Sequence, residues 1–91
     1  MSTERFQLLP VFLEVDGVPV MLIEASKQQP LYGPPYYLVS VKVIYKGIHS
    51  KVFPLMVRDE SDLRNKLKVE ITKIKFIEAM YGLEEVRRVI T

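Results

Sequence analysis

The chain has 91 residues, of which 48% are hydrophobic and 26% are charged, and its formal net charge at pH 7 is only +2. This length allows one domain over residues 1–91 with a thin core, and the composition excludes an intrinsically disordered protein. The absence of cysteine excludes a disulfide framework and a cysteine-based zinc site.

The first apolar run, from Leu8 to Leu13, is interrupted by Pro10 and followed at once by Glu14. A signal-peptide core or a membrane span needs a longer uninterrupted apolar stretch. We therefore expect no membrane association and a cytoplasmic location. The paired lysines and glutamates, with a single asparagine, are typical of thermophilic proteins.

An Asp-Gly pair, Asp16 and Gly17, lies between two runs of β-forming residues. Asp-Gly is a preferred sequence for a two-residue type I′ turn, in which both central residues take positive φ. It predicts a β-hairpin with Val15 opposite Val18. In that register one face is fully apolar and the other is mixed. The apolar face comprises Val11, Leu13, Val15, Val18, Val20 and Leu22.

The alternating pattern stops between Ala25 and Tyr36, in a segment rich in proline. We expect an irregular loop here with extended, polyproline-like parts. Irregular stretches of this length are uncommon in compact domains and often carry function. The loop tyrosines Tyr32, Tyr36 and Tyr37 could stack on nucleic-acid bases or grip a peptide, although tyrosine is also common at core edges.

A second hairpin is predicted over residues 36–57, because alternate residues of its first strand are apolar. We expect a three-residue loop that ends at Gly47 in the left-handed conformation. A two-residue loop would place Lys42 opposite Lys51, which is unfavourable, whereas the three-residue loop pairs Lys42 with Ser50. The face shared with the valines then includes Phe53 and Leu55.

An acidic segment then starts a helix that is expected to end at Tyr81, with Asp59 or Ser61 as N-cap and Gly82 as terminator. Its sheet-facing stripe comprises Leu63, Leu67, Ile71, Ile74, Ile77 and Tyr81. The spacing of Leu83, Val86 and Ile90 predicts a short extra helical turn at the C-terminus. The fold class is therefore α+β: a four-stranded antiparallel sheet from two β-hairpins, packed against one long C-terminal helix (ββββα).

This order of two hairpins and one long helix resembles the arrangement in the family of single-stranded-DNA-binding transcriptional coactivators. The resemblance implies a dimer that binds single strands with basic and aromatic residues of its sheet. It lies in the order of the elements alone, and it assigns the chain to no family.

Few residues offer catalytic or metal-binding chemistry. Asp59, Glu60 and Asp62 could bind a divalent cation, but they suit the first turn of a helix better, because the spacing of a metal-binding loop is missing. His49 has no nucleophile beside it, and we interpret it as an exposed residue near a hairpin end. The four glycines are isolated and form no phosphate-binding loop. We therefore expect no enzyme activity and no catalytic, cofactor or metal site.

Basic residues follow two edges of the predicted helix. Arg64, Lys68 and Lys75 line one edge, while Lys66 and Lys73 line another. An elongated basic surface can track the phosphates of a nucleic acid, although a solvated face balanced by glutamates is the simpler interpretation. The candidate nucleic-acid contacts are Tyr32, Tyr36, Arg64, Lys68 and Lys75.

A second apolar stripe on this helix, formed by Val69, Phe76 and Met80, lies on a different side from the sheet-facing stripe. Either the terminal segment around Val86 and Ile90 folds back over this stripe, or a second subunit covers it. The thin core favours association. We therefore predict a homodimer, with Val69, Phe76 and Met80 as its self-association residues.

The leading functional hypothesis is a non-enzymatic interaction module that is a homodimer and binds a protein partner. The alternative is a domain that binds single-stranded DNA or RNA with the basic helix edge and the loop tyrosines. Retention on a nucleic-acid column that falls steeply with salt would separate the two functions.

Overall fold

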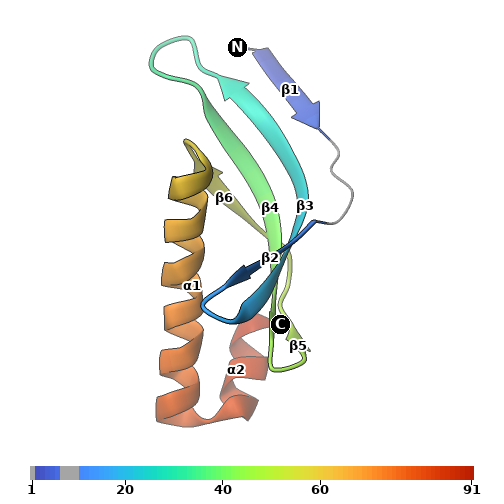
Figure 1. Cartoon of the computed structure of the whole chain (residues 1–91), viewed down its shortest axis with the longest axis vertical. Helices are drawn as coiled ribbons and strands as arrows, with labels where there is room; N and C mark the ends of the chain where they lie inside the picture. Colours follow the sequence, from blue (N-terminus) through green and yellow to red (C-terminus); the bar gives the residue numbers. More distant parts are fainter. Residues whose placement is uncertain (1, 7–10) are drawn as a thin grey trace.

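Two long antiparallel strands, β3 and β4, form the centre of the sheet (Figure 1). The computed structural model describes residues 2–6 and 11–91, and residues 7–10, which include the proline of the first apolar run, lie outside the described part. The elements are β1 (Ser2–Phe6), β2 (Val11–Val15), β3 (Val18–Gln29), β4 (Tyr36–Tyr45), β5 (Ile48–His49), β6 (Phe53–Val57), α1 (Glu60–Tyr81) and α2 (Leu83–Ile90). The fold is α+β, as predicted.

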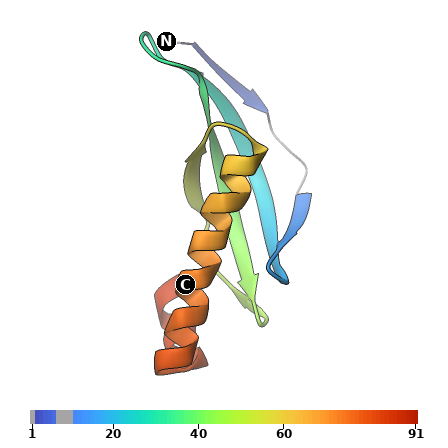
Figure 2. The same ribbon diagram turned by 60° about the vertical axis from the view of Figure 1, so that its left-hand side comes forward.

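The short strands lie along the two outer edges of the long ones. β1 and β2 both pair with β3, while β5 and β6 both pair with β4. The helices lie on one face of this sheet, and the other face is left without a covering element among the described residues (Figure 2). Every pairing is antiparallel, as expected for hairpins.

The first hairpin has the predicted register, with Val15 opposite Val18. Asp16 and Gly17 take φ values of 50° and 79°, which define the type I′ turn. The predicted apolar face points toward the helices, and Val20 at its centre is fully buried. The Asp-Gly signal and the alternation of valines are therefore sufficient to place this part of the sheet.

The predicted loop between Ala25 and Tyr36 is wrong in its first part, because β3 continues to Gln29, whereas residues 30–35 are irregular and β4 begins at Tyr36 as predicted. Alternation identifies strands that bury one face, and it fails here because the end of β3 is polar and is held by backbone pairing with β4 and with β1. This end of the hairpin extends past the first turn of α1 (Figure 1). We call the end of this hairpin, residues 27–37, together with β1 the β-arm.

The second hairpin reverses over Lys46 and Gly47, whose φ values are 48° and 81°. These values define a two-residue type I′ turn, so the predicted three-residue loop is wrong. The predicted pairing of Lys42 with Ser50 is wrong as well, because Ser50 N–H donates to the carbonyl of Val43. The unfavourable pairing of Lys42 with Lys51 does not occur, since β5 is only two residues long and ends at His49.

The extra residue expected in the turn lies instead between β5 and β6. There the buried Ser50 Oγ accepts a hydrogen bond from Val43 N–H at 2.9 Å, and the regular ladder is interrupted. The register then resumes with Phe53 opposite Val41. As a result Phe53 and Leu55 lie on the same face as the valines, as predicted.

Helix α1 begins at the predicted cap, because the Asp59 carboxylate accepts a 2.8 Å hydrogen bond from Asp62 N–H. Its buried residues are Leu63, Leu67, Ile71 and Ile74. Tyr81, predicted to face the sheet, is 71% exposed. The prediction fails because the last turn of α1 extends past the end of the sheet, so period alone overestimates the buried stripe (Figure 1).

Helix α2 follows Gly82, whose φ of 93° terminates α1 as predicted. Val86 and Ile90 are 0% and 8% exposed and complete the core with the valines of the sheet. Lys51 N–H donates a 2.8 Å hydrogen bond to the carbonyl of Ile90, so the end of α2 is fixed to the segment between β5 and β6. Of the described helices, neither is long and apolar enough to span a membrane.

Candidate interaction sites

The outer surface of α1 exposes the three apolar side chains predicted as a second stripe. Val69, Phe76 and Met80 are 54%, 62% and 61% exposed, on the side of the helix away from its buried residues. We call them the outer ridge. Val69 and Phe76 border an open, largely apolar hollow of about 620 Å³. Large apolar groups gathered on one helix face are typical of an interaction surface.

Helix α2 does not cover the outer ridge. Val86 and Ile90 lie in the core, so the alternative in which they fold over the ridge is wrong. A second hollow, of about 320 Å³, opens between α1 and α2 and shares Lys73 and Ile77 with the first. Val89, which is 49% exposed, lines this second hollow. The apolar surface therefore runs from the ridge across Ile77 to α2.

The predicted basic edge of α1 is present, but two of its three cations have partners. Arg64 lies 3.7 Å from Glu60, and Lys75 Nζ donates a 3.2 Å hydrogen bond to the carbonyl of Asp16. Lys68 has no ion-pair partner within residues 11–91. Judged from residues 11–91, the edge therefore holds one cation without an ion pair and two that are already engaged.

The structure does not bring the predicted tyrosines to this basic edge. Tyr32 is 87% exposed at the tip of the β-arm, in the loop that joins β3 to β4. Lys75 contacts the turn at the opposite end of β3, and twelve extended residues span roughly 40 Å. The five candidate nucleic-acid contacts therefore form two separate groups.

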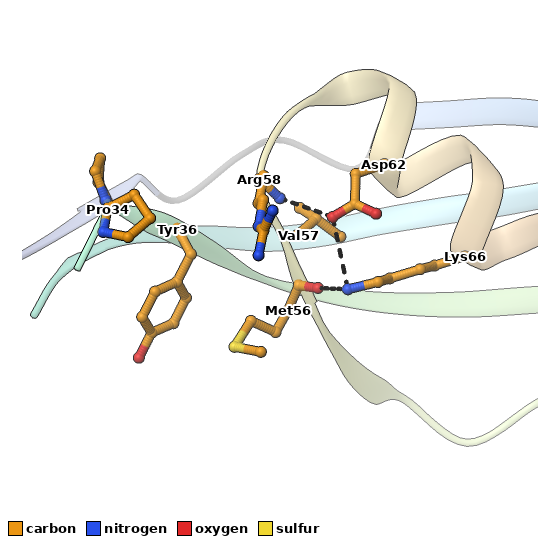
Figure 3. Close-up of a pocket in the computed structure, with 8 residues that line it drawn as sticks. Pro34, Tyr36, Met56, Val57, Arg58, Asp62 and Lys66 are labelled. Atoms are coloured by element: carbon orange, nitrogen blue, oxygen red, sulfur yellow. Dashed lines mark hydrogen bonds and ion pairs between the residues drawn. The ribbon is translucent and has the colours of Figure 1, made fainter.

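Tyr36 lies instead in a hollow of about 470 Å³ at the base of the β-arm (Figure 3). The end of β6 and the first turns of α1 form the rest of this hollow, which contains Arg58 and Lys66. Arg58 and Met56 also line this hollow, and neither is among the candidate residues predicted from the sequence. No sequence signal marks them, because three segments far apart along the chain must meet before the hollow exists.

The acidic residues at the start of α1 are engaged as caps and ion pairs. Asp59 is the N-cap, Glu60 lies beside Arg64, and the carboxylate of Asp62 accepts a 3.0 Å hydrogen bond from Arg58 N–H. Among the described residues no group of three metal-ligating side chains is arranged to hold an ion. His49 is exposed on β5, as predicted.

A small polar cluster joins the second hairpin to the last turn of α1. Tyr45 hydroxyl donates to Glu78 Oε1 and Lys46 Nζ donates to Glu78 Oε2 at 2.7 Å. Burial, reinforced by the bond to Glu78, raises the pKa of Tyr45 to about 12. The hydrogen bond from Lys46, followed by that from Tyr45, lowers the pKa of Glu78. This cluster links the second hairpin to α1, and it borders neither the outer ridge nor the hollow of Tyr36.

Comparisons with protein-family models, with curated proteins and with solved structures found no match for this chain. The function therefore has to be inferred from the surfaces themselves. Two surfaces stand out: the outer ridge of α1, and the hollow at the base of the β-arm.

Proposed function

We propose that the protein is a non-enzymatic interaction module that forms a homodimer by pairing the outer ridges of two copies. The observation that carries the proposal is the exposure of Val69, Phe76 and Met80 on a helix whose opposite side is already committed to the core. A helix with two apolar sides normally buries both.

The spacing of the ridge suits a second helix as the occupant. Val69, Phe76 and Met80 are seven and four residues apart, with Lys73 between them, which is the spacing of the contact positions of a coiled coil. An antiparallel pair centred between Lys73 and Phe76 places Val69 against Met80 of the second copy. It also places the ammonium group of Lys73 against the ring of Phe76 of the second copy, a favourable cation–π contact.

A two-fold interface uses each apolar side chain twice, once in each subunit. Three side chains alone do not supply the roughly 800 Å² per subunit of a standard interface. The two hollows beside the ridge and the aliphatic stem of Lys73 would have to contribute the rest. We therefore expect a dimer of modest affinity, with a dissociation constant on the order of micromolar.

The test is the double variant Phe76→Glu with Met80→Lys, studied by light scattering and circular dichroism. We expect a dimeric parent, and a variant that is monomeric with an unchanged helical spectrum, because neither side chain contributes to the core. The control is Leu31→Glu with Tyr32→Lys, since these side chains are 80% and 87% exposed at the tip of the β-arm. The control should remain dimeric. A parent that is monomeric at high concentration would refute the homodimer.

The second candidate function is binding of single-stranded nucleic acid, which the free ammonium group of Lys68 beside Arg64 and Lys75 favours. Retention on an oligonucleotide column, measured as a function of salt concentration, distinguishes this function from the interaction module. A phosphate-binding edge should lose affinity steeply as salt rises, whereas the interaction module should show little retention at any salt concentration.

A further inference from the structure

The hollow at the base of the β-arm is lined by Arg58, whose guanidinium has no ion-pair partner in the part of the chain that the structure describes. Alternation along β6 places Met56 on the sheet face away from the helices, because Val57 after it is buried, and Arg58 follows directly after the strand. The side chains of Tyr36, Met56 and Arg58 extend to the same side in Figure 3. Within the described residues, no carboxylate pairs with the Arg58 guanidinium.

The surrounding charges are already satisfied without Arg58. Asp62 is the carboxylate closest to it in the hollow, and it accepts the backbone N–H of Arg58 and lies 3.6 Å from the ammonium of Lys66. Lys66 also donates to the carbonyl of Met56. Among the described residues, the guanidinium of Arg58 therefore keeps a fork of donors without an ion-pair partner, although the Asp62 carboxylate also lines the hollow.

The rest of the hollow is apolar or aromatic. Pro34, Pro35 and Tyr36 form one wall and Met56 lies opposite, within a volume of about 470 Å³. That volume is within the range of pockets that hold small ligands or a few residues of a peptide. Rings of proline and tyrosine bury apolar side chains with little loss of conformational freedom, since they are rigid.

The local charge balance favours a ligand with one anionic group over a polyanion. Arg58, Arg64 and Lys66 are matched in number by the three carboxylates of Asp59, Glu60 and Asp62 at the start of α1. A nucleic-acid strand would carry its successive phosphates past those carboxylates. A single carboxylate can pair bidentately with Arg58 and leave the rest of the ligand on the apolar walls.

We propose that this hollow binds the C-terminal carboxylate of a peptide with an apolar last residue. The carboxylate pairs with Arg58, and the apolar side chain lies between Tyr36 and Met56. The site is separate from the outer ridge of α1, so it does not depend on the homodimer. It gives the interaction module a second surface and a defined class of partner.

The experiment is a titration followed by proton–nitrogen NMR, with an N-acetylated Ala-Ala-Phe tripeptide as the probe. We expect the free acid to shift the backbone resonances of Tyr36, Val57 and Arg58. The same peptide with a C-terminal amide should bind at least about tenfold more weakly, because a charge-assisted hydrogen bond is lost. Equal binding of acid and amide, or no shifts at millimolar peptide, would overturn the proposal.

Variants separate the proposed contact from general charge effects. Arg58→Gln should weaken binding of the acid by about tenfold or more, and Arg58→Lys should recover part of it as a point charge. Arg64→Gln is the matched control and should bind like the parent. Shifts of the same residues by a thymidine oligonucleotide, with none by the peptide, would assign the hollow to nucleic acid instead. The titration is repeated on the Phe76→Glu, Met80→Lys variant, so that peptide binding is also measured on a protein that does not form the proposed dimer.

Discussion

Tyr45 and Glu78, which are 33 positions apart in the sequence, are joined by a 2.5 Å hydrogen bond from the phenol to the carboxylate. The turn residue Lys46 holds the other carboxylate oxygen. Because Tyr45 is only 4% exposed, the bond lies at the edge of the core, where water does not compete freely for the hydroxyl. Protonation of this cluster is therefore coupled to the stability of the contact between hairpin and helix.

In acid, we expect the stabilising contribution of Glu78 to disappear. Its pKa is lowered in the folded protein, so its contribution is fully present above the ordinary value of 4.5 and is lost as pH falls through the lower folded value. The urea midpoint of Glu78→Gln should lie below that of the parent at pH 7, and the gap should close in acid. Glu84→Gln, at an exposed carboxylate, is the control and should show no such convergence.

In alkali, Tyr45 should show the opposite trend. Its folded pKa of about 12 lies above the ordinary value of 10.0, so its contribution is complete below pH 10 and is lost as pH rises toward 12. We expect the difference in urea midpoint between the parent and Tyr45→Phe to shrink over that range. A difference that stays constant to pH 12 would mean that the phenol does not titrate with folding.

Replacement of Gly17 tests the first turn. Its φ is 79°, and a Cβ added there would meet no atom within 4 Å, so any cost arises from backbone conformation alone. We expect Gly17→Val to lower the free energy of unfolding by roughly 1–2 kcal/mol in urea titrations. Asp16→Asn should be nearly neutral, because asparagine accepts the same conformation. Parental stability of Gly17→Val would contradict the type I′ assignment.

Ser50→Ala tests the interruption of the second hairpin. The hydroxyl accepts the N–H of Val43, a fully buried residue, and donates to the carbonyl of Lys51 at 2.8 Å. Its removal leaves a buried donor unsatisfied, and we expect a loss of roughly 1–3 kcal/mol. Hydrogen exchange at the amide of Val43 should accelerate accordingly. Ser61→Ala, at an exposed serine, should have little effect.

The double variant Lys68→Glu with Lys75→Glu tests the basic edge. Both side chains are exposed, so the fold should remain intact, with a small effect from the lost contact of Lys75 with Asp16. If the parent binds a single-stranded oligonucleotide at low salt, the variant should bind it much more weakly. Two positive side chains that could contact phosphates become negative and repel them. Equal binding by the two proteins would exclude this edge as the contact surface.

The core of the fold follows from sequence pattern because its signals are local. Asp16 and Gly17 specify a turn by their own conformational preferences, and the period of Leu63, Leu67 and Ile71 identifies the buried side of α1. The exposed ridge around Phe76 is visible in the same way, since it breaks the rule that one side of a surface helix is polar. These features require no knowledge of distant contacts.

The β-arm and its hollow could not be predicted because their determinants are not local. Lys27 and Gln28 are polar, and they form a strand only because β1 and β4 supply backbone partners on both sides. Charge repulsion between Lys42 and Lys51 disfavours a two-residue turn at Lys46 in a regular hairpin, but the interruption at Ser50 removes that pairing. Arg58 gains its role only when β6, the loop and α1 meet.

β1 and β2 pair with different parts of β3, and the free energy of local opening should differ between these two parts. Pairs formed with β2 lie over the buried core of α1, whereas those with β1 depend on the backbone of the β-arm beyond the first turn of that helix (Figure 1). Local opening free energies follow buried apolar contact more than the number of ladder bonds. Amides of residues 27–29, beyond the core contact of Ala25, should therefore exchange by a sub-global opening that leaves residues 18–22 protected and the domain folded.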